Sequence, residues 1–333
     1  MNKKNWLLLI LACTIAFTSF NSCKKDNDED TTDTGPTEWV RSIVFKNDPR
    51  NGAASFTIGN EAYVVGGFVR NEGVVNDGSS FNGSTWTDIT DFPGEARQMA
   101  VGFSINGKGY VGTGSTGTED LDDFYSYDPA TKVWTAIAPF PGKARYGAVA
   151  FTLGNYAYVG LGSTRTDAKF SDFYRYDPAT NSWSEIPVPF KYKKAFAFAF
   201  VIGDRAYVGG GYANSSTLPE DFYAFDGTNW TPLADLNRND DTYTYDARKY
   251  NASAFVIGNA GYVVSGRGTG SGITATVWKY EPASDSWTDK HQSLPADARE
   301  KAVGFALNGK GYITTGLNGA FIFDNTWEFT QVR

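Results

Sequence analysis

The chain has 333 residues, with 30 Lys and Arg against 37 Asp and Glu, and a formal net charge of −7. An acidic chain lacks the basic footprint of a general nucleic-acid-binding protein, so we expect no nucleic-acid partner. The 36 Gly and the 16% aromatic content are typical of an all-β protein with many turns. One His and two N-terminal Cys leave almost nothing from which to build a Ser-His-Asp triad, a Cys-His dyad or a multi-His metal site.

The first 22 residues have the features of a secretory signal peptide. A pair of lysines precedes an apolar stretch from Trp6 to Phe17, which is too short to span a bilayer about 30 Å thick. The stretch is followed by Phe20-Asn21-Ser22-Cys23, which resembles a bacterial lipoprotein cleavage site although Phe20 replaces the usual Leu. That resemblance implies removal of residues 1–22 and lipidation of Cys23. The alternatives are ordinary signal-peptidase cleavage and an uncleaved anchor.

Residues 23–36 are predicted to be the lipidated Cys followed by a disordered acidic tether, because they contain no large apolar side chain. We therefore expect an exported outer-membrane lipoprotein that contacts the membrane through its lipid anchor only. An acidic run after the lipidated Cys resembles a surface-export signal of some Gram-negative lineages, which favours exposure at the cell surface. The alternative is a solvated spacer.

One pattern recurs six times over residues 37–333: a basic residue, an apolar strand with a repeated Phe, and a second strand that begins with Gly-Tyr or Ala-Tyr. A third strand with paired aromatic residues follows, then a turn such as Asp128-Pro129, then a fourth strand opened by Trp. The spacings between the repeated Phe residues are 47, 48, 49, 55 and 50. These residues are Phe56, Phe103, Phe151, Phe200, Phe255 and Phe305. Four short strands in each unit predict the blade of a β-propeller.

The spacing of Trp and Arg predicts how the ring closes. Trp39 precedes Arg50 by 11 residues, the same interval as from Trp86 to Arg97 and from Trp134 to Arg145. Trp39 therefore belongs to a fourth strand, and residues 325–329 have the pattern of a third strand. We predict an all-β, six-bladed propeller of four-stranded blades, closed by one N-terminal and three C-terminal strands, with no unpaired edge between the first and last blades.

The glycines after Tyr-Val, the segment Tyr127-Asp128-Pro129-x-Thr131-x-x-Trp134 and the basic residue that opens each unit resemble kelch repeats across residues 37–333. The resemblance implies a kelch-type propeller, the fold of the central domain of galactose oxidase and of some exported bacterial sialic acid mutarotases. A galactose oxidase site needs a Cys cross-linked to Tyr and two His ligands. Residues 24–333 hold no Cys and one His, so we expect no copper oxidase activity, no metal and no cofactor.

A basic residue precedes each predicted innermost strand. By the kelch resemblance, these cations surround one mouth of the propeller, where they would attract an anionic ligand. The predicted ligand-binding cations are Arg50, Arg97, Arg145, Lys194, Arg248 (or Lys249) and Arg299. Because Arg at this position is part of the kelch consensus, the alternative is a structural role in which loop carboxylates such as Glu95, Asp246 and Asp297 neutralise the ring.

Loops on that face supply further candidates. The insertion at residues 237–245 carries Tyr243 and Tyr245, which we predict as ligand-stacking residues, with a polar surface loop as the alternative. Other candidates are Arg70, Arg165, Lys169, Tyr212 and Arg267. An acidic loop at residues 119–123 does not match an EF-hand, so we predict a solvated loop, with a calcium site as the alternative.

The main prediction for function is a non-catalytic envelope protein that recognises a glycan or protein ligand of anionic character. A cofactor-free sugar mutarotase or epimerase is the first alternative. There an Arg would neutralise the sugar carboxylate, and Glu95 or Glu300 would move protons. A structural subunit of an envelope complex is the second alternative.

Overall fold

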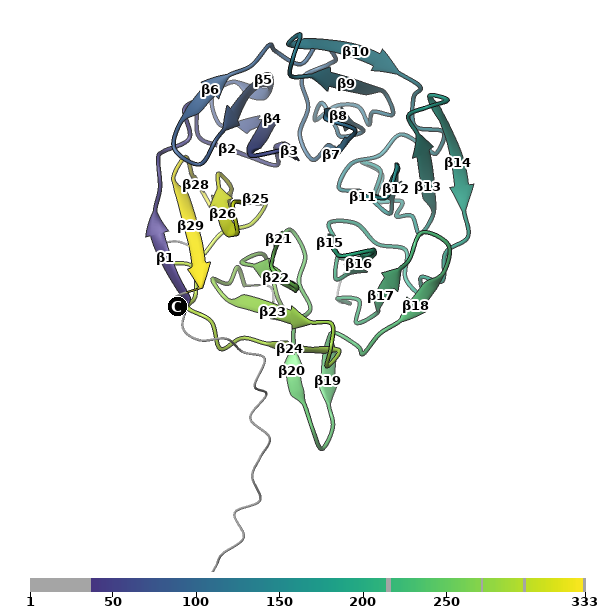
Figure 1. Ribbon diagram of the computed structural model, residues 1–333, viewed down its shortest axis with the longest axis vertical. Coiled ribbons are helices and arrows are strands. Elements are labelled where there is room, and N and C mark those ends of the chain that lie inside the picture. Colours follow the sequence, from purple (N-terminus) through teal and green to yellow (C-terminus); the bar gives the residue numbers. More distant parts are fainter. Residues whose placement is uncertain (1–36, 214–216, 271, 296–297, 332–333) are drawn as a thin grey trace, which may run out of the picture. The chain divides into compact units, whose positions relative to one another are not determined.

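The computed structural model describes residues 37–213, 217–270, 272–295 and 298–331. The predicted signal peptide, Cys23 and the tether lie outside the described residues. Six antiparallel sheets are arranged as a ring around a central axis (Figure 1). Among the described residues there is no apolar helix of the length that a bilayer crossing requires.

The first three blades are continuous in sequence, and each runs from an inner first strand to an outer fourth strand. Blade 1 comprises β3 (Ala54–Ile58), β4 (Glu61–Val69), β5 (Gly73–Phe81) and β6 (Trp86–Asp88), with β2 (Arg50–Asn51) also paired to β4. Blade 2 comprises β7 (Val101–Ile105), β8 (Lys108–Gly112), β9 (Phe124–Asp128) and β10 (Val133–Ile137). Blade 3 comprises β11 (Val149–Leu153), β12 (Tyr156–Gly160), β13 (Phe173–Asp177) and β14 (Ser182–Ile186).

The last three blades complete the ring, and the sixth combines both ends of the described chain. Blade 4 comprises β15 (Phe198–Ile202), β16 (Arg205–Gly209), β17 (Phe222–Phe225) and β18 (Trp230–Pro232). Blade 5 comprises β21 (Ser253–Ile257), β22 (Ala260–Val264), β23 (Val277–Glu281) and β24 (Ser286–Thr288). Blade 6 comprises β25 (Val303–Leu307), β26 (Lys310–Thr314), β29 (Thr326–Gln331) and β1 (Thr37–Arg41).

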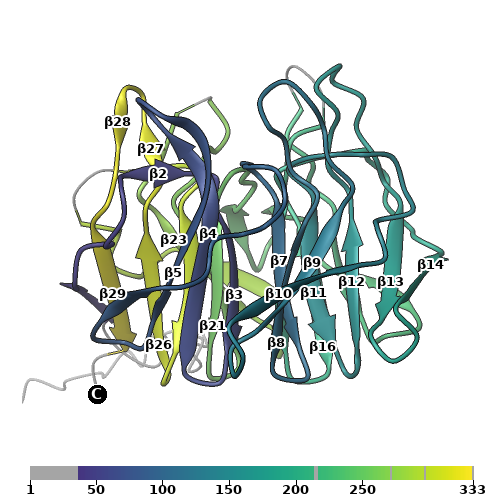
Figure 2. The same cartoon turned by 90° about the horizontal axis from the view of Figure 1, so that it is seen from above.

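Two small hairpins lie outside the blades. The hairpin of β19 (Asn237–Asn239) and β20 (Thr244–Asp246) projects outward from the perimeter of the ring (Figure 1). The hairpin of β27 (Leu317–Asn318) and β28 (Phe321–Ile322) lies with β2 on one face of the ring (Figure 2). We call this the mouth face; the turns between first and second strands lie on the opposite face.

The predicted closure is confirmed. Strand β1 pairs antiparallel with β29, so that Trp39 lies opposite Phe329. Their ring centroids are 4.8 Å apart, and the Trp39 indole Nε1 donates a hydrogen bond of 2.9 Å to the Gln292 carbonyl. The first and last strands of the described chain therefore share one sheet, which leaves no open edge between blades 6 and 1.

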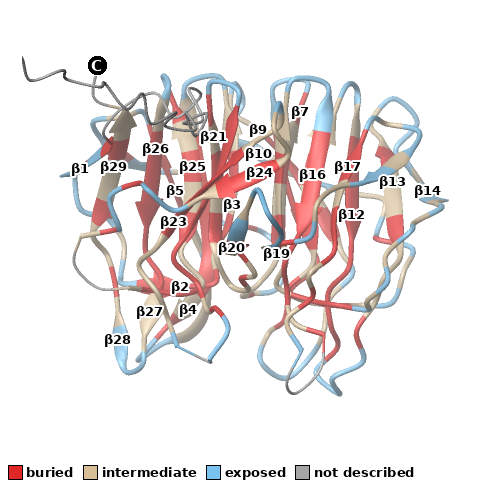
Figure 3. Ribbon diagram, turned by 90° about the horizontal axis from the view of Figure 1, so that it is seen from below, coloured by how far each residue is buried: buried red, intermediate tan, exposed pale blue. Residues whose placement is uncertain are grey.

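The repeated Phe and Tyr form the core between blades. In each blade the Phe of the first strand lies directly opposite the Tyr of the second, with ring centroids 4.8 to 5.5 Å apart. Phe56 also packs against the neighbouring blade, where a Cβ at Gly109 would lie 2.0 Å from its ring. The Gly of that Gly-Tyr pair is therefore fixed by close packing. Figure 3 shows burial along the strands and exposure at the loops.

Six main-chain hydrogen bonds form a closed ring at the mouth end of the first strands. The residue two positions after each basic ring position has a left-handed φ between 51° and 63°. Each of these N–H groups donates to the carbonyl of its counterpart in a neighbouring blade, with N···O distances of 2.7 to 3.1 Å. We call these residues the collar: Gly52, Met99, Gly147, Phe196, Asn251 and Lys301. Because every blade both donates and accepts, the collar joins all six blades through their backbones.

Candidate functional site

A channel runs along the axis of the ring. One cavity of about 200 Å³ is lined by small residues of the six first strands, mostly Ala, Gly and Ser. A second cavity of about 110 Å³ is lined by the collar and the alanines beside it. The collar residues Met99, Phe196, Asn251 and Lys301 therefore bring larger side chains to the mouth end of a channel that is otherwise narrow and lined by small residues.

The predicted ring cations are buried inside the blades. Arg50, Arg97, Arg145, Lys194 and Arg299 are all at most 2% exposed. Arg145 is representative: its Nη1 and Nη2 donate to the two carboxylate oxygens of Asp172 at 2.5 and 2.9 Å. Its Nη1 also donates to the Leu161 carbonyl and its Nε to the Lys143 carbonyl, both at 2.9 Å. The guanidinium is thus surrounded by internal acceptors.

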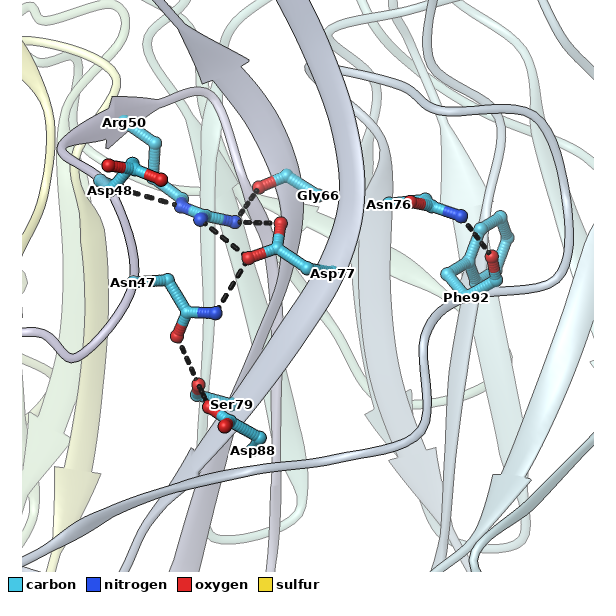
Figure 4. A network of polar contacts seen from close by, with 9 residues as sticks. All are labelled: Asn47, Asp48, Arg50, Gly66, Asn76, Asp77, Ser79, Asp88 and Phe92. Atoms are coloured by element: carbon cyan, nitrogen blue, oxygen red, sulfur yellow. Dashed lines mark hydrogen bonds and ion pairs between the residues drawn. The ribbon is translucent and has the colours of Figure 1, made fainter. Parts of the chain in front are cut away.

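The same pairing recurs around the ring. Three further pairs are Arg50–Asp77, Arg97–Asp123 and Lys194–Asp221, with N···O distances of 2.6 or 2.7 Å. Figure 4 shows Arg50 held by Asp77 and by the carbonyls of Gly66 and Asp48. Arg299 donates to the Thr315 carbonyl and lies 4.2 Å from the Phe323 ring centroid. These contacts favour the structural alternative for the ring.

The carboxylates that neutralise the ring differ from those expected. They lie 26 or 27 residues after their cations, at or just before the third strand of the same blade. The Glu95 side chain is exposed, and only its backbone carbonyl accepts from Arg97 Nε, at 2.8 Å. Asp297 lies outside the described residues.

The prediction of Arg248 as the fifth ring position is wrong, and Lys249 occupies it. The Lys249 carbonyl accepts from Gly211 at 2.7 Å, as the Arg145 carbonyl accepts from Gly114 at 2.8 Å. Lys249 Nζ donates to the hydroxyls of Thr274 and Thr276. Burial lowers the pKa of Lys249 to about 8, opposed by the charge of Asp246.

Arg248 instead pairs locally with Asp246, at 2.8 and 2.9 Å. Its side chain is partly exposed and belongs to the connection after the β19–β20 hairpin. Asp246 therefore forms an ion pair, but it does so outside the buried ring.

The two predicted tyrosines do not lie at the mouth. They belong to the β19–β20 hairpin, which the structure places at the outer perimeter of the ring. Tyr245 is 8% exposed, and its ring centroid lies 6.3 Å from that of Trp278. Tyr243 packs under Arg238, whose Cζ is 4.4 Å from the ring centroid. The insertion therefore packs its aromatic side chains against the outside of blade 5.

A different group of residues gathers at the mouth: Tyr212, Tyr250, Asn251, Arg267 and Glu300, which we call the mouth cluster. Arg267 Nη2 and Nε donate to the two oxygens of Glu300 at 2.7 and 2.9 Å, and Asn251 Nδ2 donates to Glu300 at 2.9 Å. The backbones of Tyr250 and Arg267 form a β-bridge. Asn251 lines the 110 Å³ cavity, so the cluster adjoins the channel.

The mouth cluster combines a buried carboxylate, that of Glu300, with a more accessible guanidinium, that of Arg267. Glu300 is 5% exposed, whereas the Arg267 side chain is 30% exposed. Burial acts to raise the pKa of Glu300, but the hydrogen bonds from Arg267 and Asn251 outweigh it and lower the pKa below its usual value. Burial raises the pKa of Tyr250, which therefore keeps its proton at neutral pH. The cluster thus holds a carboxylate, a guanidinium and a phenol in adjacent positions.

The remaining loop candidates divide between mouth and surface. Arg70 and Arg165 are exposed. Lys169 is buried beside the mouth, with its Nζ 5.1 Å from the Tyr212 ring centroid. In the acidic loop Asp123 is paired with Arg97, and Asp120 accepts from the Arg165 backbone at 3.0 Å. Across the described residues there is no group of three or more His, Cys, Asp or Glu side chains placed to hold a metal ion.

Sequence reasoning singled out Tyr212, Arg267 and Glu300 separately but missed Tyr250, Asn251 and the collar. The sequence does contain a signal for these residues. Tyr250 directly follows a basic ring residue, and each collar residue, Asn251 included, lies two positions after one. Left-handed backbone at the second position is indicated by Gly52, Gly147 and Asn251, because Gly and Asn adopt it most readily.

Comparison with known proteins agrees with this architecture. N-acetylneuraminate epimerase of Yersinia enterocolitica serotype O:8 / biotype 1B (strain NCTC 13174 / 8081) is 46% identical over 55 residues, which is 14% of this chain and 14% of that protein's length. The solved structure of YjhT superposes with a TM-score of 0.72 at 16% identity, over 86% of this chain and 95% of that chain. The KLHDC2/KLHL20/DRC7 Kelch-repeats domain matches residues 18–202, more than half of the sequence. The chain belongs to this family of kelch-repeat β-propellers.

Proposed function

We propose that the protein binds an acidic sugar at the mouth cluster and interconverts its anomers without a cofactor. The observation that carries the proposal is the bidentate contact between the accessible Arg267 and the buried Glu300 at the channel mouth. The short stretch similar to N-acetylneuraminate epimerase supports the choice of an acidic sugar. This proposal favours the enzymatic alternative over the main prediction made from sequence.

Three residues of the mouth cluster have a direct role in this reaction. The planar guanidinium of Arg267 binds the sugar carboxylate through two parallel hydrogen bonds. Glu300 accepts the proton of the anomeric hydroxyl while the ring C–O bond breaks. Tyr250, or a water beside it, donates a proton to the ring oxygen and gives the open-chain ketone. Reclosure on the other face of the carbonyl returns both protons and produces the second anomer.

Substrate binding would also make Glu300 a better base. In the free protein the Arg267 guanidinium holds the Glu300 pKa down against the effect of burial. A substrate carboxylate that takes hydrogen bonds from Arg267 weakens this hold. Burial then dominates, and the pKa of Glu300 rises toward the range in which a carboxylate is an effective proton acceptor.

Exchange spectroscopy by proton NMR tests the proposal, with N-acetylneuraminate as the substrate and the anomeric interconversion rate as the readout. We expect the protein to accelerate exchange, Glu300→Gln to abolish the acceleration, and Arg267→Met to weaken binding as well. Arg70→Met is the matched control, because Arg70 is an exposed Arg in a loop of the mouth face. No acceleration by the unmodified protein would overturn the enzymatic proposal. Saturable binding without exchange would then favour a non-catalytic recognition protein.

We also propose that the chain is exported and anchored to the outer membrane by a lipid on Cys23, exposed at the cell surface. The basic and apolar N-terminal segment and the Ser22-Cys23 junction support this proposal. Intact-mass analysis of the protein from a bacterial envelope tests it. We expect a diacylglyceryl mass increment on a chain beginning at Cys23, lost in Cys23→Ser. Digestion by protease added to whole cells tests surface exposure.

A further inference from the structure

A second cation lies beside the mouth cluster, separated from Arg267 by two tyrosine rings. Lys169 Nζ is 5.1 Å from the centroid of the Tyr212 ring. The Tyr212 and Tyr250 ring centroids are 5.4 Å apart, and the Tyr250 backbone is bridged to that of Arg267. Lys169, Tyr212, Tyr250 and Arg267 therefore follow one another along the mouth across blades 3, 4 and 5. We call them the mouth arc.

Each end of the mouth arc is a cation that pairs with a carboxylate of the same chain. The Lys169 side chain is 4% exposed and pairs at 2.5 Å with Asp167, whose side chain is 79% exposed. Arg267 pairs with Glu300 at 2.7 Å. The Asp167 carboxylate is largely in water, so its replacement by a ligand carboxylate costs little desolvation. A buried cation with an exposed, exchangeable partner is a suitable anion subsite.

The centre of the arc is suited to sugar rings. Tyr212 and Tyr250 are both half-buried. Aromatic side chains offer a flat apolar body together with a polar hydroxyl, which matches the mixed surface of a sugar. A single sugar bound at Arg267 and Glu300 would leave Tyr212 and Lys169 without a ligand contact.

We propose that the mouth arc binds an oligosaccharide with two acidic sugars, one carboxylate at Arg267 and the other at Lys169, with Tyr212 and Tyr250 beneath the chain between them. The inference rests on the proposed function for the Arg267 end. It extends the substrate class from a free acidic sugar to a diacidic glycan, and it assigns Lys169 as a second anion-binding residue.

Titration calorimetry with three ligands tests the inference. The ligands are N-acetylneuraminate, its glycoside with lactose, which has one carboxylate on a longer chain, and the α-linked dimer of N-acetylneuraminate, which has two. We expect the dimer to bind at least about tenfold more tightly than either of the others, the effect of one further charge-assisted hydrogen bond. Lys169→Met should remove this gain and leave the affinity for N-acetylneuraminate unchanged.

Two further variants make the test specific. Asp167→Asn removes the competing carboxylate, so it should increase the affinity for the dimer and not for the single sugar. Lys108→Met is the matched control: Lys108 also pairs with an Asp, at 3.3 Å, but it is the first residue of β8, next to the β7–β8 turn on the opposite face. Lys108→Met should leave the affinity for all three ligands unchanged.

The outcomes separate the two proposals. If N-acetylneuraminate binds but the dimer gains nothing, or if Lys169→Met leaves the gain intact, the second subsite is refuted and the proposed function stands. If none of the three ligands binds, both proposals fail. If the lactose glycoside gains as much as the dimer, chain length and not the second charge provides the affinity, and the role of Lys169 is refuted.

Discussion

Replacing Arg145 by Met tests the structural role of the buried cations. The substitution keeps much of the side-chain volume and removes every hydrogen bond of the guanidinium. It leaves the Asp172 carboxylate without its bidentate partner, and it leaves the carbonyls of Leu161 and Lys143 without a donor. It also removes the stacking of the guanidinium on Phe140 and Phe170, whose ring centroids lie 4.7 and 3.9 Å from Arg145 Cζ.

The size of the effect follows from these contacts. Breaking a buried ion pair by removing one partner costs about 3–5 kcal/mol, because the remaining charge stays buried. Asp172 is 24% exposed, so water relieves part of that cost. The two lost carbonyl hydrogen bonds and the cation–π contacts add about 1–2 kcal/mol. We expect a loss of about 4 kcal/mol, a large fraction of the about 5–15 kcal/mol typical of a folded domain.

Urea unfolding monitored by Trp fluorescence gives the free energy of unfolding, and Lys249→Met is the internal comparison. Lys249 occupies the same ring position but has hydroxyl partners in place of a carboxylate. Removing it leaves no orphaned charge and relieves the burial that lowers the Lys249 pKa, so we expect no loss of stability near neutral pH. If the two variants lose equal stability, or if Arg145→Met loses less than about 1 kcal/mol, the argument that the ring is a set of structural ion pairs is refuted.

Three further predictions follow. Lys249 releases its proton near pH 8 in the folded chain and near 10.5 when unfolded, so the unfolded state binds more protons between these values. Stability should therefore rise by about 1–2 kcal/mol from pH 8 to 9.5 in urea titrations, and Lys249→Met should abolish that rise. Trp39→Ala removes the contact between β1 and Phe329, so it should lower the free energy of unfolding by about 3–5 kcal/mol. Calorimetry should show a lower melting temperature. An unchanged melting temperature would refute the closing role of β1. For the proposed reaction, the acidic limb of kcat/KM should report the lowered Glu300 pKa of the free protein, and the limb of kcat should lie at higher pH; coincident limbs would contradict substrate-induced activation of Glu300.

The fold was predictable from sequence because a propeller repeats one local solution. The pairing of a Phe with a Tyr occurs once in each of the six blades. A chance pattern would not recur six times at a regular spacing. The closing strand was predictable for the same reason, since Trp39 lies 11 residues before Arg50, as Trp86 and Trp134 lie before Arg97 and Arg145. Features that depend on regular spacing along the chain can therefore be predicted from the sequence.

The site was harder to predict, because sequence shows charge but not burial. The basic residues that open each repeat suggested a ligand-binding ring, whereas each forms a hydrogen bond or ion pair inside its own blade. The Asp residues 26 or 27 positions later were a readable signal for this pairing. The mouth cluster is assembled from loops of blades 4, 5 and 6, and their lengths follow no repeat. Tyr243 and Tyr245 were misplaced because an insertion length does not say to which side of a blade the chain turns.

The affinity of N-acetylneuraminate for Arg267→Met, measured beside that of Lys249→Met, tests the central claim most directly. Both variants exchange a cation for Met, one at the accessible mouth and one in the buried ring. The account predicts that Arg267→Met loses at least about tenfold in affinity, as expected for a bidentate charge-assisted contact, while Lys249→Met binds as the unmodified protein does. Equal affinities for Arg267→Met and the unmodified protein, or a loss confined to Lys249→Met, would contradict the assignment of the mouth cluster as the site.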